Sequence, residues 1–220
     1  MNRSKKNIVD ELYWDNRVDA SKVTVEVDEG RVVLRGEVPT YLASTAAHDD
    51  ALKMLGVVSV DNQLIVSYPV SATVPSDVEI LTEIEKKLFR NPDIDILDLE
   101  VEVVSGEVSL RGTVDAYWKK LHAEDLAVSE PGVLIINNHL AIVPANDVID
   151  QDIANDIVRS IEARAAVSAD DVNVEVLNGH VTLTGNVPTW TAREAAYEAA
   201  LFTAGVVDVE NNIVISAPAV

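Results

Sequence analysis

The chain has 220 residues, of which 48% are hydrophobic, and a formal net charge of −20. A surface of that charge repels nucleic-acid phosphates and anionic lipid headgroups at long range, and we expect no nucleic-acid partner. The chain contains no cysteine, which excludes disulfides, thiolate metal sites and a cysteine nucleophile. Only 5% of the residues are aromatic, so the core is expected to be aliphatic.

The start of the chain, residues 1–12, is basic but is not followed by an apolar run of roughly 7–15 residues. No stretch approaches the roughly 18 uninterrupted apolar residues of a membrane-spanning helix. We therefore expect a cytoplasmic protein with no transmembrane segment. A trimmed mature form would instead be periplasmic.

A glycine pattern recurs three times. The motif G-x-V-x-L-x-G occupies residues 30–36, 106–112 and 179–185, and another glycine always follows 20 residues later. An aromatic residue and an asparagine also keep fixed offsets, at Tyr41, Tyr117 and Trp190 and at Asn62, Asn138 and Asn211. Agreement at so many offsets predicts three tandem copies of one unit. We interpret nine glycines as structural: Gly30, Gly36, Gly56, Gly106, Gly112, Gly132, Gly179, Gly185 and Gly205.

Each copy opens with a helical pattern. Apolar residues at i, i+4 and i+8 give one buried stripe, as in Ile80, Ile84 and Leu88 of the second copy and Ile153, Ile157 and Ile161 of the third. The first copy keeps only Ile8 and Leu12 of this stripe. Ser76 and Glu79 have the spacing of a capping box at the start of the second copy's helix.

Two strands of alternating character follow the helix. They cover residues 23–27, 99–103 and 172–176, and then 32–34, 108–110 and 181–183. The Asn178-Gly179 pair between two of them is typical of a type I′ turn, so each pair of strands is expected to form a hairpin.

A second helix follows the hairpin and leads to a last strand. Thr40 and Thr189 are candidate N-caps. Alanine pairs at i, i+4, such as Ala47 and Ala51, would let this helix lie close to the sheet, and the next glycine is expected to end it.

The order αββαβ predicts an α+β fold of three tandem modules, each a three-stranded mixed sheet with two helices packed on one face. We place the domains at residues 1–69, 76–144 and 147–217. The linkers between them are short and contain proline, which favours closely set domains over freely tethered ones.

This frame resembles the BON domain of bacterial osmotic-stress and nodulation-specificity proteins. The resemblance is carried by Gly36-x-Val38 and its two repeats, by the alanine pairs, and by endings of the type Gly56-Val57…Val60-x-Asn62-x-Leu64. It extends over essentially the whole chain. It implies a link to osmotic and envelope stress and a role in phospholipid or protein binding. It implies neither a catalytic activity nor a cofactor.

Candidates for catalysis or metal binding are weak. His48, His122, His139 and His180 lack the spacing of a zinc site and are interpreted as surface or packing residues. The acidic run over residues 93–102 lacks the glycine and terminal glutamate of an EF-hand and is interpreted as a solvated face. No Ser-His-Asp order, nucleophile elbow or phosphate loop is present. We therefore expect no enzyme, no catalytic residue, no metal and no cofactor.

The aromatic residues at the entry to each second helix are the first part of a candidate interaction surface. They are Tyr41, Tyr117, Trp118 and Trp190. Tyr and Trp suit membrane and protein interfaces alike. The alternative is that each ring packs over its own glycine and helix end.

Basic residues are the second part. Net charge, counted from the sequence, is −3 for the first copy (8 basic, 11 acidic), −8 for the second (6, 14) and −9 for the third (3, 12). The first copy therefore holds the basic candidates, which are Lys5, Lys6, Arg31 and Arg35. If one copy approaches an anionic surface, it should be the first.

Two functions follow from these features. The first is a stress-associated binding module that contacts phospholipid or the membrane periphery. The alternative is a protein-binding, scaffolding or chaperone-like role, in which the sheets contact partners or further copies of the same chain as a homo-oligomer.

Overall fold

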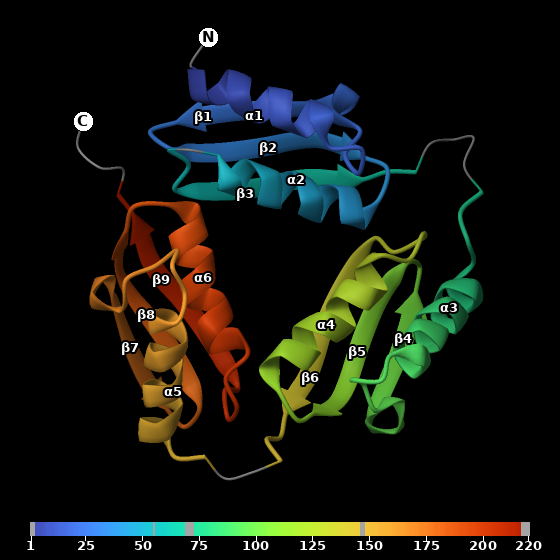
Figure 1. Cartoon of the computed structure of the whole chain (residues 1–220). Coiled ribbons are helices and arrows are strands. Elements are labelled where there is room, and N and C mark those ends of the chain that lie inside the picture. Colours follow the sequence, from blue (N-terminus) through green and yellow to red (C-terminus); the bar gives the residue numbers. More distant parts are fainter. Residues whose placement is uncertain (1–2, 55, 69–72, 146–147, 217–220) are drawn as a thin grey trace. The chain divides into compact units, whose positions relative to one another are not determined.

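The computed structural model describes residues 3–54, 56–68, 73–145 and 148–216 (Figure 1). The order αββαβ occurs three times along these residues, each time with its own three-stranded sheet. The predicted α+β class and the three tandem modules are thus confirmed. The predicted domain limits at 1, 69, 147 and 217, and parts of both linkers, lie outside the described residues.

The first module contains α1 (Arg3–Trp14), η1 (Ala20–Lys22), β1 (Val23–Asp28), β2 (Arg31–Val38), α2 (Tyr41–Lys53) and β3 (Ser59–Val66). The second contains α3 (Asp77–Arg90), η2 (Ile96–Asp98), β4 (Leu99–Val104), β5 (Glu107–Val114), α4 (Tyr117–Val128) and β6 (Ile135–Ile142). The third contains α5 (Asp150–Glu162), η3 (Ala169–Asp171), β7 (Val172–Leu177), β8 (His180–Val187), α6 (Trp190–Leu201) and β9 (Asp208–Ile215). The short 3₁₀ helices are an addition to the predicted elements.

The middle strand of each sheet is the second strand of the hairpin, in the orders β1-β2-β3, β4-β5-β6 and β7-β8-β9. In the first module β1 pairs with β2 antiparallel, and β3 pairs with β2 parallel. The third module repeats both pairings, with Val174, Leu183 and Asn211 side by side across the sheet. Each module therefore ends on an edge strand.

The hairpin turns have the geometry that the sequence predicts. Both central residues of each turn have positive φ, which is the mark of a type I′ turn. The pairs are Glu29 (44°) with Gly30 (85°), Ser105 (52°) with Gly106 (76°), and Asn178 (51°) with Gly179 (75°).

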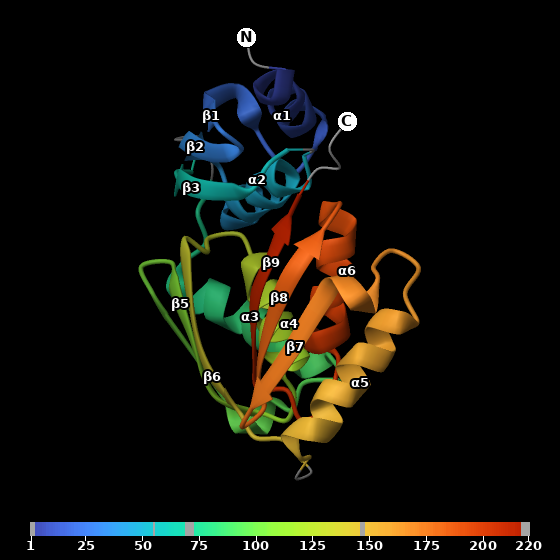
Figure 2. The ribbon, with the colours of Figure 1, turned by 90° about the vertical axis from the view of Figure 1, so that its left-hand side faces the viewer.

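The core of each module lies between the sheet and its two helices. In the third module α5 and α6 lie on the same side of the sheet (Figure 2). Ile157 of α5, Leu183 of β8 and Ala196 of α6 are all fully buried in one apolar cluster. In the first module Ile8, Leu34 and Ala47 take the same places. The predicted helix stripes and alanine pairs are therefore core residues.

The first and third glycines of the repeat touch one another. A Cβ atom on Gly30 would lie 2.8 Å from the carbonyl oxygen of Gly56, and the Gly30 oxygen accepts a hydrogen bond from Val58 N at 2.8 Å. The same approach recurs between Gly106 and Gly132 and between Gly179 and Gly205. The expectation that the third glycine ends the second helix is wrong in detail, because α2 ends at Lys53, and Gly56 lies within the later turn that the hydrogen bond from Val57 N–H to the Met54 carbonyl oxygen closes.

The second glycine of the repeat allows another close approach. A Cβ atom on Gly36 would lie 2.0 Å from the carbonyl oxygen of Lys22, and one on Gly185 would lie 2.1 Å from that of Asp171. Both glycines also have strongly positive φ, 122° and 140°. No other residue fits these positions without a shift of the backbone.

The predicted caps are present. Thr40 and Thr189 accept hydrogen bonds from the backbone N–H of Ala43 (3.0 Å) and Ala192 (3.1 Å). Ser76 and Glu79 form a reciprocal capping box. The repeated asparagines also have a local role, since the Asn62 and Asn211 carboxamides accept from the N–H two residues later, each at 3.2 Å. These bonds satisfy backbone donors of the last strands.

Candidate interaction surface

The basic candidates of the first module lie on two different elements. Arg31 and Arg35 belong to β2 and are exposed on the face of the sheet opposite to the buried Val32 and Leu34. Lys5 and Lys6 belong to α1, which packs on the buried side. The structure therefore does not bring the four cations into one patch.

Arg35 is already engaged within the module. Its guanidinium donates to the Glu26 carboxylate at 2.7 Å and to the Gln63 side-chain oxygen at 2.9 Å. These contacts tie the three strands together on the outer face. In the second module Arg111 makes the corresponding pair with Glu102 at 2.8 Å. We therefore assign Arg35 a structural contact before any ligand contact.

The aromatic candidates occupy equivalent places in their own modules. Tyr41, Tyr117 and Trp190 are the first residues of α2, α4 and α6, and all are half-buried, as is Trp118. Burial raises the pKa of Tyr41 and, more strongly, that of Tyr117.

The two tryptophans have cations from their own helices over their rings. Lys119 Nζ lies 5.7 Å from the Trp118 ring, and the Arg193 guanidinium lies 5.0 Å from the Trp190 ring. Cation–π contacts of this kind hold a ring in place. Both rings thus have packing partners inside their own modules.

A second aromatic feature, which the sequence pattern did not reveal, ends the first helix. Tyr13 and Trp14 of α1 are 75% and 76% exposed, and their rings meet edge to face at 5.8 Å between centroids. Val9, one turn earlier, is also exposed. Large aromatic side chains at such exposure are the main departure of this module from an ordinary polar surface. We call Val9, Tyr13 and Trp14 the α1 aromatic tip.

The repeat itself contains a signal for this tip. Counted from the glycine motif, Tyr13 and Trp14 correspond to Phe89 and Arg90 in the second module and to Glu162 and Ala163 in the third. The pair is thus a feature of the first module, although Phe89 is also 75% exposed. A comparison of the copies position by position would have found it.

The opposite end of α1 is basic. Lys5 and Lys6 lie in the first turns of α1, which has no acidic residue in its first turn. By contrast, α3 and α5 start with Asp77 and Glu79 and with Asp150 and Asp152. A cation near a helix N-terminus opposes the helix dipole, at about 0.3–1 kcal/mol each. The charges at the start of α1 are therefore unfavourable for the helix, whereas those at the start of α3 and α5 are favourable.

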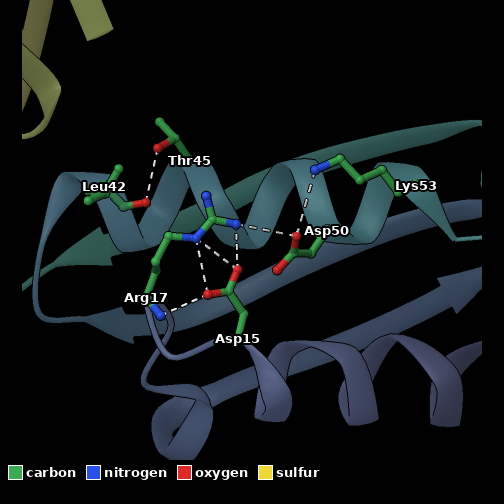
Figure 3. A network of polar contacts seen from close by, with 6 residues as sticks. All are labelled: Asp15, Arg17, Leu42, Thr45, Asp50 and Lys53. Carbon is green, nitrogen blue, oxygen red and sulfur yellow. Dashed lines mark hydrogen bonds and ion pairs between the residues drawn. The ribbon is translucent and has the colours of Figure 1, made fainter. Parts of the chain in front are cut away.

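A network of polar side chains joins the segment after α1 to α2 (Figure 3). Arg17 donates to the Asp15 carboxylate through Nε at 2.9 Å and Nη2 at 2.5 Å, and the Arg17 backbone N–H donates at 2.8 Å. These bonds hold the pKa of Asp15 well below its usual range. Arg17 Nη2 also lies 3.8 Å from Asp50 Oδ1 on α2.

The acidic run and the histidines show no feature of a metal or catalytic site in the part of the chain that is described. The acidic side chains Asp93, Asp95, Glu100 and Glu102 are all exposed, as expected of a solvated face. His48 and His122 are half-buried, whereas His139 and His180 are exposed. Across the described ranges no three His, Asp or Glu side chains gather as a metal site would require. Among the described helices, none has the length and apolar character to cross a membrane.

Two solved structures of CdsD, a structural protein of the type III secretion system of Chlamydia trachomatis, align with the chain. Both are 16% identical; one match covers 96% of this chain and 91% of the other with a TM-score of 0.28, and the second covers 98% of each with 0.27. Such low TM-scores carry no structural argument.

Two relatives are similar in sequence. Osmotically-inducible protein Y of Escherichia coli K12 is 28% identical over 136 residues, which cover 59% of this chain and 66% of that protein. An uncharacterized protein from the gshII 5' region of Anaplasma centrale is 32% identical over 114 residues, 50% of this chain and 74% of the relative. The first match thus spans just under two thirds of that relative's length.

The BON domain family model matches three times, at residues 3–68, 76–144 and 149–217. These matches cover nearly the whole chain and coincide with the three αββαβ modules. Together with the glycine frame and its backbone contacts, they establish that the chain belongs to the BON domain family and carries three BON domains in tandem.

Proposed function

We propose that the protein is a non-enzymatic, stress-associated binding module that contacts phospholipid at the membrane periphery through its first module. The observation that carries this proposal is the α1 aromatic tip, on the same helix as Lys5 and Lys6. Tyr and Trp favour the headgroup level of a bilayer, and Lys favours anionic headgroups.

The charge distribution supports the first module as the contact. The chain carries a net charge of −20, most of it in the second and third modules, so an anionic membrane repels these modules more strongly. Basic residues at the start of α1 oppose its dipole, and departures from local folding preference are expected at functional sites. A membrane contact gives these residues a role that helix stability does not.

The stress association is supported by the relative that is named as osmotically inducible. An increase of this protein after osmotic upshift, measured by quantitative mass spectrometry of whole cells, is expected. Constant abundance under osmotic and envelope stress would remove this part of the proposal.

Sedimentation with vesicles tests the membrane contact. At low salt, the full chain is expected to co-sediment with phosphatidylglycerol vesicles. Replacing Tyr13 and Trp14 by Ala should weaken binding at least about tenfold, because full burial of a large apolar side chain contributes roughly 1.5–3 kcal/mol. Phe89→Ala, an equally exposed aromatic in the second module, is the matched control and should bind as the parent does. No binding to anionic or phosphatidylcholine vesicles would overturn the proposal.

A second candidate function is protein binding or scaffolding, and the last strands favour it. β3 and β9 are edge strands, and Ile65 and Val214 near their ends are 66% and 56% exposed. Edge strands with exposed apolar residues pair readily with other chains. Light scattering would detect such pairing as a dimer or larger species, which Ile65→Lys and Val214→Lys should dissolve. A monomer at all concentrations would contradict self-association.

A further inference from the structure

The helix α2 buries a carboxylate that the other modules lack. Asp50 is only 6% exposed, whereas the equivalent residues, counted from the glycine motif, are Leu126 in the second module and Ala199 in the third. A buried carboxylate is costly unless hydrogen bonds or charges compensate it. The first module therefore holds a charged group at a place where the fold itself needs only an apolar one.

The compensation of Asp50 is incomplete. Its Oδ1 lies 3.8 Å from Arg17 Nη2 and 3.9 Å from Lys53 Nζ, which is within ion-pair range but beyond hydrogen-bond range. Its Oδ2 is buried and, within the described part of the chain, has no hydrogen-bond partner. The short hydrogen bonds of Arg17 go to Asp15, so the two carboxylates share one cation unequally.

One proton would change this arrangement. Two neighbouring carboxylates repel each other, but a protonated carboxyl donates a hydrogen bond to an ionised one. We propose that Asp50 is an acid-sensitive tie: on protonation it donates to the Asp15 carboxylate and fastens the segment that ends α1 onto α2. In neutral solution the two carboxylates repel each other and share the Arg17 cation, so the attachment of this segment to α2 is weaker.

The surrounding charges are consistent with this direction. Burial, then the hydrogen bond that a protonated Asp50 forms with Asp15 and the negative charge of Asp15, raise the pKa of Asp50 to about 6, against the opposing charges of Lys53 and Arg17. The negative charge of Asp49 on α2 contributes to raising the pKa of Arg17. Because the folded pKa lies above the unfolded value of 3.8, the tie is strong below about pH 4 and weakens as pH rises through about 6. Asp15 stays ionised throughout that window, since its own pKa is lowered.

The tie bears on the candidate contact because Asp15 directly follows Trp14. A firmer attachment of Asp15 to α2 presents the α1 aromatic tip in one fixed orientation, which lowers the entropy cost of docking. The link to membrane contact rests on the proposed function, whereas the tie itself does not. Failure to bind vesicles would therefore leave the test below unaffected.

Hydrogen exchange of the full chain tests the tie without any membrane. After correction for the intrinsic pH dependence of exchange, protection of residues 13–18 is expected to be about tenfold higher at pH 5 than at pH 7.5, given a shift from 3.8 to about 6. Asp50→Asn supplies a permanent donor and should show high protection at both values. Asp50→Leu introduces the residue that the second module has at this place. It should abolish the pH dependence and leave the protection of residues 13–18 low at both pH values.

The third module supplies an internal control. Residues 162–167 form the equivalent segment without a carboxyl pair and should show no such pH dependence. Equal pH dependence in both segments, or in Asp50→Asn, would overturn the tie. Carboxyl carbon NMR of the unmodified chain gives an answer that does not depend on the folding of any variant. An Asp50 midpoint near pH 6 is expected, and a midpoint near 3.8 would overturn the proposal.

Discussion

The first and third modules place different side chains on the same backbone. Asp50 of the first module is buried beside Arg17, whereas Ala199 of the third fills the equivalent place with a methyl group. Ser44 accepts a hydrogen bond from Asn62, but its counterpart Arg193 donates to backbone carbonyls of β9. In the segment after the first helix, Arg17 donates a hydrogen bond to the Asp15 carboxylate in the first module. In the third module Arg164 instead donates to the Ser160 carbonyl oxygen.

The comparison separates what the fold requires from what each module adds. The shared parts are glycines with positive φ, short aliphatic side chains and threonine caps, all of which serve close backbone approach or burial. The parts that differ are polar, charged or exposed aromatic groups. Substitutions at the second glycine and at the threonine caps should therefore act alike in the first and third modules, and substitutions outside the frame should act in one module alone.

The largest effect is expected at the second glycine of the frame. Gly36→Ala should destabilise the first module by about 3 kcal/mol or more, because its Cβ would lie 2.0 Å from the Lys22 carbonyl oxygen. Gly185→Ala should cost the third module as much. Gly56→Ala is the control, since its φ is also positive but no atom of the described residues lies within 4 Å of the place its Cβ would take, so about 1 kcal/mol is expected. Hydrogen exchange resolved by module measures all three; unequal effects of the first two would break the comparison.

Asp15→Asn should have the next largest effect, in the first module only. It removes the charge-assisted bonds to Arg17, with an expected cost of about 2 kcal/mol at pH 7. Because the folded pKa of Asp15 is lowered, its contribution is present above the unfolded value of 3.8 and is lost as pH falls below it. Denaturant titrations measure the free energy of unfolding of variant and parent, and the difference between the two should be smaller at pH 3 than at pH 7. An equal difference would refute the assignment.

The helix caps should have smaller and equal effects. Thr40→Ala and Thr189→Ala should each cost about 1 kcal/mol, since each hydroxyl accepts from a backbone N–H at the start of its helix. The second module has Ala116 at this place, so Ala116→Thr should stabilise it by about 0.5–1 kcal/mol. Thermal unfolding followed by circular dichroism would record the shifts, and a loss of stability in Ala116→Thr would show that the frame is not equivalent there.

The smallest effect on folding is expected at the α1 aromatic tip. Tyr13→Ala and Trp14→Ala should change stability by less than about 0.5 kcal/mol, because both side chains are at least 75% exposed. A larger loss in chemical denaturation would assign these rings to the packing of the module and leave them no separate role in contact.

Much of the fold could be predicted from the sequence. The period of the glycines, the i, i+4 stripes and the Asn-Gly turn indicate the module, its order and its core directly, because each encodes local backbone geometry. The reason for the glycine at position 30, its close approach to the Gly56 carbonyl oxygen, cannot be read from the sequence because the contact forms only in the folded module. The same is true of the pairing of Asp15 with Arg17 next to Asp50, since residues 35 positions apart meet only in the folded module. Exposure of Trp14 also depends on where α1 ends.

Hydrogen exchange of the full chain with and without phosphatidylglycerol vesicles tests the central claim most directly. A shared frame with one distinctive surface predicts added protection over residues 5–14 of α1, and none over α3 and α5, the helices that occupy the same place in the other modules. Equal protection of all three helices, or protection confined to β3 and β9, would contradict a membrane contact through the first module.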